Sequence, residues 1–398
     1  MARERNSDGP LIFLVAGEPS GDQLGARLMA ALKTETGGKV RFAGVGGERM
    51  AREGLQSLFP MEELAVMGLA EVVPHLRRIL RRLREVVAAV RTSGADAVVT
   101  IDSPSFGLRV LKRLSGIRRP RIHYVAPQVW AWKPWRAKQM AGCVDHLLAL
   151  LPFEPPIFER HGLRTTFVGH PVVEVAGQAH DGAAFRREHG IPADAPIVCM
   201  LPGSRGGEVA RLLPVFEETA CLLAESLPGL QVVVPTVAGV RRTVERSSRG
   251  WTVPVTVVAG TDEKYAAFAT SQAAIAASGT VAVELAVAGL PAIIAYRVNP
   301  VTAFLARRLI RVRFASLPNL VLDREVQPEL LQENCTPDKL AEALRPLLAD
   351  AAIRADYVRD CRLAAEALGL GGLPPSRRAA RAVLETVTDW QTRTGPTA

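Results

Sequence analysis

Residues 11–22 read LIFLVAGEPSGD, an apolar run of six that passes directly into a turn rich in Gly and Ser. Such a short, bounded run predicts a buried strand, and the helical pattern of residues 24–32 follows the turn. A turn of this kind offers backbone N–H groups to an anion or a sugar hydroxyl. It is equally well explained as a strand–helix connection capped by Ser20 or Asp22. The spacing of a P-loop is absent.

The same succession of strand, turn and helix recurs along the chain. Further short apolar runs that predict strands lie at 40–45, 97–101, 121–125, 147–150, 165–168, 197–201, 231–234, 254–258, 273–277 and 292–296. Strands that alternate with helices in this way are typical of parallel sheets with crossover helices. Ligands bind beyond the carboxyl ends of such strands, so the turns there are the first candidates for function.

The length of the chain predicts two domains, because 398 residues are too many for one ordinary core. Pro171 and the stretch 177–182, which is rich in small and polar residues, divide the predicted strands into two series. We therefore expect an α/β architecture of two Rossmann-like domains that face each other across a cleft. The predicted bounds are 1–172 for the first domain and 183–367 for the second.

The net charge of +9 and the isoelectric point near 9.7 indicate an acidic partner, namely nucleic acid, anionic lipid or a phosphorylated substrate. Nothing in the chain resembles a nucleic-acid-binding module. The densest basic block, 77–84, falls on an amphipathic helix, whose arginines could also be a solvated outer face. No apolar run approaches the roughly 18 residues that span a bilayer. The run 11–17 is too short for most signal peptides, so a cytoplasmic protein is expected.

Three other turns after predicted strands carry polar side chains. Asp102 directly follows the strand 97–101, where a carboxylate is well placed to act as a general base. An Asx-turn that closes the strand explains this aspartate equally well. Residues 203–205, Gly-Ser-Arg, are better explained as a site that binds a diphosphate than as a plain surface turn. Residues 278–280, Ser-Gly-Thr, open a helix in the same way. Glu284, one helical turn further, could reach ribose hydroxyls. Alternatively, it is simply an acidic residue that the helix dipole favours in the first turn.

No two Asp residues are separated by a single residue, so a D-x-D metal motif is absent. A leaving diphosphate would then be stabilised by helix termini and Arg, without a metal or cofactor.

Three of the five Trp residues fall between 130 and 135, beside Lys133 and Arg136. Packing alone rarely concentrates indoles in this way, because each buried N–H needs a partner. We interpret Trp130 and Trp132 as part of the wall of the cleft near Asp102, with contact to a lipid as the alternative.

Taken together, these motifs resemble the lipid-A-disaccharide synthases, which are inverting glycosyltransferases of the two-domain GT-B type. The resemblance covers about residues 11–348. Its motifs are VAGE with SGD at 15–22, MEELAVMG at 61–68, ID at 101–102, HYV with VWAW at 123–132, LPFE at 151–154, GH at 169–170, LPGSRG at 201–206, ASGT at 277–280, SLPNL at 316–320 and ELLQE at 329–333.

The resemblance implies a reaction in which UDP-2,3-diacylglucosamine donates its sugar to 2,3-diacylglucosamine 1-phosphate, giving the β-1,6-linked disaccharide 1-phosphate and UDP. It implies Asp102 as the general base, and Glu18, Ser20 and Asn319 as cleft residues needed for activity. The residues implied for UDP binding are Gly203, Ser204, Arg205, Ser278, Gly279, Thr280 and Glu284. Those implied for contact with an anionic membrane surface are Val66, Met67, Leu69, Arg77, Arg78 and Arg81, which would hold the protein at the inner face of the cytoplasmic membrane.

The chain also departs from the family pattern. An acidic residue and an Asn are common in the family where this chain has Ser105 and Gly107, and Gln128 and Pro19 stand where Ser and Thr are common. The resemblance further implies a C-terminal helix within 368–398 that packs back on the N-terminal domain. Some members form homodimers by exchanging C-terminal domains.

Two alternatives remain open on the sequence. A soluble enzyme like the UDP-sugar 2-epimerases would share the UDP turns and lack the apolar and basic segment at 66–91. A non-enzymatic nucleotide-binding protein would leave Asp102 and the Trp cluster unexplained.

Overall fold

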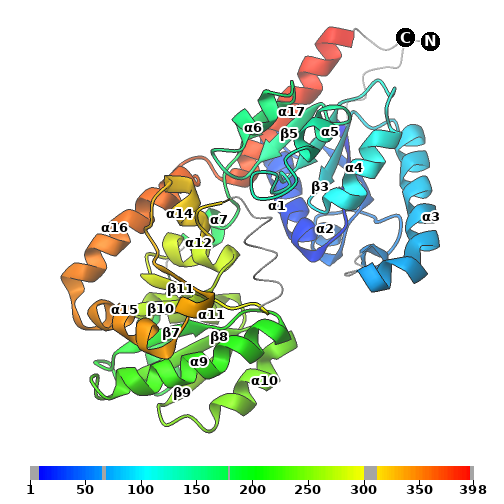
Figure 1. Cartoon of the computed structure of the whole chain (residues 1–398). Coiled ribbons are helices and arrows are strands. Elements are labelled where there is room, and N and C mark those ends of the chain that lie inside the picture. Colours follow the sequence, from blue (N-terminus) through cyan, green and yellow to red (C-terminus); the bar gives the residue numbers. More distant parts are fainter. Residues whose placement is uncertain (1–8, 65–68, 178–179, 300–311, 395–398) are drawn as a thin grey trace. The chain divides into compact units, whose positions relative to one another are not determined.

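The computed structural model describes residues 9–64, 69–177, 180–299 and 312–394, and for 69–76 it describes the backbone only. The chain forms two compact units. The N-terminal unit comprises Met1–Pro171 and Leu373–Ala398, and the C-terminal unit comprises Val172–Gly372. Each unit is a parallel sheet covered by helices on both faces (Figure 1).

The N-terminal unit is built on a sheet that has six strands in the described residues. These are β1 (Leu11–Ala16), β2 (Arg41–Val45), β3 (Ala97–Ile101), β4 (Arg121–Tyr124), β5 (His146–Ala149) and β6 (Arg164–Phe167). All neighbours are parallel, in the order β2-β1-β3-β4-β5-β6. The chain leaves β1 for β2 on one side and returns to β3 on the other. The gap between β1 and β3 is therefore the switch point at which open α/β sheets bind ligands.

The C-terminal unit repeats this arrangement within its described residues. Its strands are β7 (Ile197–Leu201), β8 (Gln231–Thr236), β9 (Val255–Ala259), β10 (Ala273–Ala277), β11 (Ala292–Tyr296) and β12 (Glu329–Leu331). They pair in parallel in the order β12-β11-β10-β7-β8-β9. The order reverses between β7 and β10, so a second switch point lies there.

Helices cover both faces of the N-terminal sheet. They are α1 (Pro19–Glu35), α2 (Glu48–Arg52), the 3-10 turn η1 (Met61–Glu63), α3 (Leu69–Ser93), α4 (Pro104–Arg113), α5 (Arg136–Ala141), α6 (Pro155–Glu159) and α17 (Pro375–Thr394). On one face, α1 packs with α17, whose Ala379 and Val383 are fully buried in the core. On the other face, α3, α4 and α5 bury apolar side chains such as Leu83, Val110 and Met140.

Helices of the C-terminal unit also pack on both faces of its sheet. They are α7 (Val173–Ala176), α8 (Gly182–Glu188), α9 (Gly206–Ala224), α10 (Ala238–Ser248), α11 (Thr261–Thr270), α12 (Thr280–Val287), α14 (Leu317–Leu322), the 3-10 turn η2 (Gln332–Asn334), α15 (Pro337–Ala349) and α16 (Ala351–Ala367). Helices α9, α10 and α15 share the core on one face. Helices α8 and α11 bury Phe185 and Ala267 on the other.

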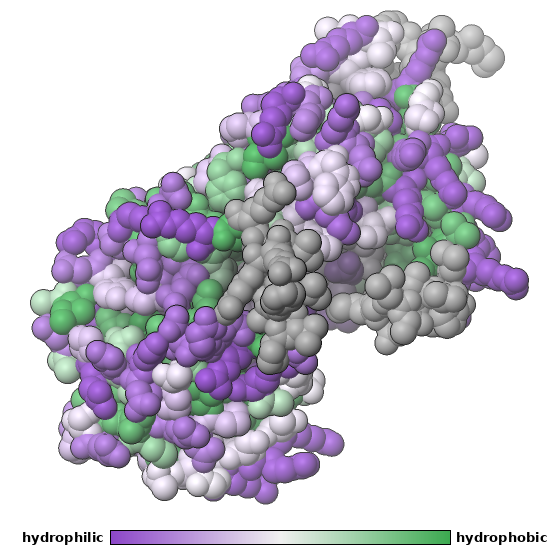
Figure 2. Space-filling model, viewed as in Figure 1, coloured by the Kyte–Doolittle hydropathy of each residue, from purple (hydrophilic) through white to green (hydrophobic). Residues whose placement is uncertain are grey.

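The basic helix α3 turns most of its arginines outward. Arg77, Arg78 and Arg81 are exposed, and hydrophilic side chains project over this helix in Figure 2. Arg82 instead points inward, where it forms a bidentate ion pair with Glu63 at 2.9 and 2.7 Å and lies over the ring of Phe59. Arg82 therefore connects α3 to η1.

The predicted membrane residues Val66 and Met67 lie outside the described residues, as does the side chain of Leu69.

The strands predicted from apolar runs are confirmed, with ends that differ by at most two residues. Strand β12 was missed because it is three half-buried residues, Glu-Leu-Leu, with no apolar run. No helix in the described part of the chain combines the length and the apolar character needed to cross a bilayer.

Candidate active site

The switch point of the N-terminal sheet brings together residues that are far apart in the sequence. Glu18 and Ser20 follow β1, and Asp102 follows β3, so both turns lie at the same edge of neighbouring parallel strands. The hydroxyl of Ser20 donates a 2.6 Å hydrogen bond to Oδ2 of Asp102. Three side chains selected from the sequence therefore meet at one point of the fold.

The backbone at Asp102 is held in a conformation that few residues with a side chain adopt. Its φ is +52° and that of Ser103 is +41°. Left-handed residues of this kind cost energy and cluster at functional sites. The Asp102 N–H donates to the carbonyl of Tyr124 on β4, and the Ser103 N–H donates to Oδ1 of Asp102 at 2.8 Å. With the bond from Ser20, each carboxylate oxygen has one donor.

The second carboxylate of this group, Glu18, has a pKa above its ordinary value. Partial burial raises the pKa of Glu18, the negative charge of Asp102 raises it further, and a hydrogen bond from Ser103 opposes both. Asp102, with two donors, is suited to the role of the base.

A buried pair on neighbouring strands lies near Asp102. His123 of β4 is fully buried, and its Nδ1 lies 2.7 Å from the Thr100 hydroxyl of β3. Burial lowers the pKa of His123 to about 4, so the ring is neutral. A Cβ added to Gly107 would lie 3.1 Å from Cβ of Thr100. Glycine at position 107 thus lets α4 pack closely on this pair.

Asp22, the last residue of the first motif, has a structural task. It is buried, and its carboxylate accepts hydrogen bonds from the N–H groups of Gly47, Arg49 and Met50 at 2.8, 3.0 and 3.0 Å. It therefore caps α2, whereas the sequence suggested a cap of its own helix. Ser20 likewise bonds to Asp102 and does not cap α1.

The switch point of the C-terminal unit carries two further turns selected from the sequence. Gly203, Ser204 and Arg205 follow β7, and Ser278, Gly279 and Thr280 follow β10, its neighbour in the sheet. Gly203 has a φ of +110°, and a Cβ there would lie 2.6 Å from Oε2 of Glu208, so glycine is required. Helix α9 begins directly after the first turn and α12 begins at Thr280 of the second, and helix N-termini favour anions.

Neighbouring side chains already contact these turns. Glu208 accepts from the N–H groups of Ser204 and Arg205 at 3.2 and 3.3 Å, and its Oε1 lies 3.4 Å from the exposed guanidinium of Arg205. The Ser278 hydroxyl donates to the carbonyl of Ala315 at 3.0 Å.

Glu284, expected at the ribose, forms a 2.7 Å ion pair with Lys264 of α11. Lys264 was missed because it lies inside a helix and belongs to no motif.

Asn319, predicted as a cleft residue needed for activity, has its side chain inside the fold. It is fully buried, and both ends of its amide are occupied. Its Nδ2 donates to the Gln327 carbonyl and to Glu329, and its Oδ1 accepts from the N–H groups of Val326 and Gln327, all at 2.7–2.8 Å. Asn319 therefore holds α14 against the segment before β12. Through Glu329, which also accepts from the N–H of Ala315, it supports the loop that Ser278 contacts.

The Trp cluster is divided between packing and exposure. The indole of Trp130 is half-buried and donates to Glu154, whereas Trp132 is 44% exposed, with Lys133 over its ring at 4.1 Å. Trp135 is 58% exposed. Trp130 is therefore part of the fold at the carboxyl edge of the sheet, and Trp132 projects from it.

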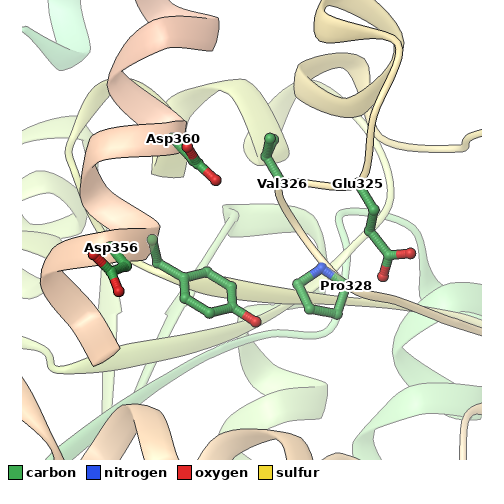
Figure 3. A pocket seen from close by; sticks show the side chains of 6 residues that line it. Glu325, Val326, Pro328, Asp356 and Asp360 are labelled. Carbon is green, nitrogen blue, oxygen red and sulfur yellow. The ribbon is translucent and has the colours of Figure 1, made fainter. Parts of the chain in front are cut away.

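One cavity, of about 320 Å³, lies elsewhere in the C-terminal unit (Figure 3). It is lined by Glu325, Val326, Pro328, Asp356, Tyr357 and Asp360. Its carboxylates disfavour a diphosphate, and residues 325–328 precede β12, at the edge of the sheet opposite to the carboxyl ends. It is therefore a poor candidate for the UDP site.

Solved structures of similar architecture define the class. The UDP-N-acetylglucosamine 2-epimerase of Neisseria meningitidis matches with a TM-score of 0.61 and 10% identity, over 95% of this chain and all of that one. MurG of Acinetobacter baumannii matches with a TM-score of 0.57 and 14% identity, over 96% and 99%. The calicheamicin glycosyltransferase matches with a TM-score of 0.58 and 18% identity, over 98% and 100%. The protein therefore has the two-domain α/β GT-B fold, which by itself does not separate transferases from epimerases.

Sequence relatives distinguish between a transferase and an epimerase. The family model for lipid-A-disaccharide synthetase matches residues 12–370. The lipid-A-disaccharide synthase of Rhodospirillum centenum is 57% identical over 380 residues, which are 95% of each chain. That of Paramagnetospirillum magneticum is 54% identical over 381 residues, 95% of this chain and 97% of the relative. The chain belongs to the lipid-A-disaccharide synthase family.

Proposed function

We propose that this protein is a hexosyltransferase that joins UDP-2,3-diacylglucosamine to 2,3-diacylglucosamine 1-phosphate. The products are the β-1,6-linked lipid A disaccharide 1-phosphate and UDP. Membership of the family supports the reaction, and one observation in the fold carries it: each set of polar turns selected from the sequence lies at the switch point of its own sheet. The N-terminal unit takes the acceptor, and the C-terminal unit takes the sugar nucleotide.

In the proposed step, Asp102 acts as the base. The 6-hydroxyl oxygen of the acceptor attacks the anomeric carbon of the donor and its proton passes to Asp102, while the bond between that carbon and the diphosphate oxygen breaks. The configuration at the anomeric carbon inverts. Ser20, by its 2.6 Å bond, fixes the orientation of the carboxylate.

The leaving UDP carries the charge that the C-terminal unit must stabilise, without a metal. The N-terminus of α9 and the guanidinium of Arg205 meet the diphosphate, with Ser204 and Gly203 shaping the turn. Ser278, Gly279 and Thr280 open α12 toward the nucleotide, and Glu284 exchanges its bond to Lys264 for the ribose hydroxyls. Asn319 acts indirectly, through the loop behind Ser278.

Release of UDP tests this function. Purified protein with UDP-diacylglucosamine is expected to release UDP only when the acylated sugar phosphate is added, and mass spectrometry should show one disaccharide 1-phosphate for each UDP. Isomerisation of the UDP-sugar without an acceptor would indicate an epimerase and would contradict the proposal.

We further propose that the N-terminal unit binds the inner face of the cytoplasmic membrane through α3. Both substrates carry acyl chains, so they must be taken from a bilayer. Arg77, Arg78 and Arg81 are exposed on this helix, and Arg82 anchors it through Glu63. Val66, Met67 and Leu69 would enter the interface next to them. Exchange of C-terminal domains between two chains stays a prediction.

Replacing Arg77, Arg78 and Arg81 together by Ala should weaken binding to anionic vesicles about 100-fold, because each arginine contributes about 1 kcal/mol near such a surface. Flotation with phosphatidylglycerol vesicles in dilute salt measures the effect. The control is the triple change of Arg241, Arg242 and Arg246 on α10, which removes the same charge from exposed positions of the other unit. Equal loss in both triple variants would show that only net charge matters.

A further inference from the structure

A buried carboxylate holds the tryptophan loop, which we define as residues 125–135. Glu154 follows β5 and is 2% exposed. Its Oε2 accepts from the N–H groups of Leu150 and Leu151 at 3.1 and 3.0 Å, and its Oε1 accepts from the indole N–H of Trp130 at 3.2 Å. Trp130 also meets the ring of Phe153 edge-on, with centroids 5.4 Å apart. Residues 153–154 thus hold this indole on two sides.

The tryptophan loop begins beside the proposed base. The carbonyl of Tyr124, the last residue of β4, accepts from the N–H of Asp102 at 2.9 Å. The next residue, Val125, has a φ of +83°, which is a strained value for a β-branched side chain. Backbone strain persists only where surrounding contacts hold it. Buried Val129 and the bond from Trp130 to Glu154 are such contacts.

We propose that Glu154 is a positioning residue for glycosyl transfer, because it holds Trp130 and with it the start of the tryptophan loop beside Asp102. The proposal rests on the proposed function for the reaction that it affects. Capping the turn at 150–151 needs only Oε2 of Glu154. Its Oε1 contacts the indole, so the carboxylate joins two loops that follow neighbouring strands, β4 and β5.

The protonation state of Glu154 gives a way to observe this contact. Burial raises the pKa of Glu154 to about 7, although the N–H donors of Leu151, Trp130 and Leu150 oppose the rise. We expect the proton on Oε1, because Oε2 already accepts from two N–H groups, and a neutral O–H is a weaker acceptor for the indole N–H than a carboxylate oxygen. Ionisable side chains on the elements packed around this residue are Arg121, His123 and Tyr124 of β4, Arg136 and Lys138 of α5, His146 of β5, Glu159 of α6 and Arg164 of β6, which pairs with Asp389.

Fluorine NMR of protein labelled with 5-fluorotryptophan tests the contact without any turnover. The Trp130 signal, assigned by its loss in Trp130→Phe, should shift in the wild-type protein with a midpoint near pH 7. It should not titrate in Glu154→Gln, and it should titrate normally in Glu159→Gln, an exposed glutamate five residues further on. A signal that is constant with pH in the wild type, or that titrates equally in Glu154→Gln, would overturn the proposal.

Activity then tests the consequence by a double-mutant cycle. Glu154→Gln places an amide NH₂ opposite the indole, and Trp130→Phe removes the N–H but keeps a ring against Phe153. Each change is expected to lower kcat/KM about tenfold, and the double variant also about tenfold, because the same contact is lost. Additive losses, or wild-type rates in Glu154→Gln, would refute the positioning role. Failure of the proposed function would appear differently, as wild-type protein that releases no UDP while its Trp130 signal still titrates.

Discussion

Asp102→Asn is expected to lower kcat about 1,000-fold while the KM for both substrates changes little. The amide keeps the size of the side chain and an oxygen that can accept from the Ser103 N–H, but it cannot take the proton of the attacking hydroxyl. General bases contribute about 10²- to 10⁴-fold to such reactions, which sets the magnitude. Initial rates of UDP release, measured over a range of each substrate, separate kcat from KM.

The matched control for this variant is Asp389→Asn. Asp389 lies on α17 of the same unit and forms an exposed 2.7 Å ion pair with Arg164. Exposed pairs contribute little, so its rate should stay within about twofold of the wild type. An Asp102→Asn protein that keeps a tenth or more of the wild-type kcat would exclude Asp102 as the base.

Asp22→Ala is expected to lower the free energy of unfolding of the N-terminal unit by about 3 kcal/mol. The change leaves three N–H groups without their acceptor, the buried one of Met50 and the partly buried ones of Gly47 and Arg49. Each unsatisfied buried donor costs about 1–3 kcal/mol, part of which water recovers by entering the space left by the carboxylate. Urea unfolding followed by circular dichroism measures the loss, and hydrogen exchange of the three amides locates it.

Glu48→Ala is the control for this stability effect, because Glu48 lies in the same helix, α2, and is exposed. Its substitution should change the free energy of unfolding by less than about 0.5 kcal/mol. If Asp22→Ala were equally mild, the carboxylate would not be the cap that holds α2.

The strands of both units could be predicted from the sequence because a strand buried on both faces reads as a continuous apolar run. Residues 97–101 and 273–277 are fully buried from end to end, and each was predicted with the correct bounds. Strand β12 lies at an edge and is half-buried, so Glu329–Leu331 shows no such pattern. The order of the strands was not predicted, since it depends on where each crossover helix packs.

The meeting of Ser20 with Asp102 followed in outline from the rule that turns after parallel strands share one edge. The direction of each side chain did not follow, because it depends on contacts between segments far apart in the chain. Asp22 lies two residues from Ser20 and turns inward to cap α2. Asn319 lies in one of the motifs that resemble the family. Only the structure reveals that both ends of its amide form hydrogen bonds within the fold.

The terminal helix α17 has a consequence for the order in which the protein can form. Its Ala379, Ala380 and Val383 complete the core beneath β1 and β3, although all of the C-terminal unit lies between them and Pro171 in the sequence. The ribosome therefore releases the C-terminal unit as a contiguous segment before the N-terminal unit has all of its core. The N-terminal unit is thus synthesised first, but it is the last unit that can complete its core.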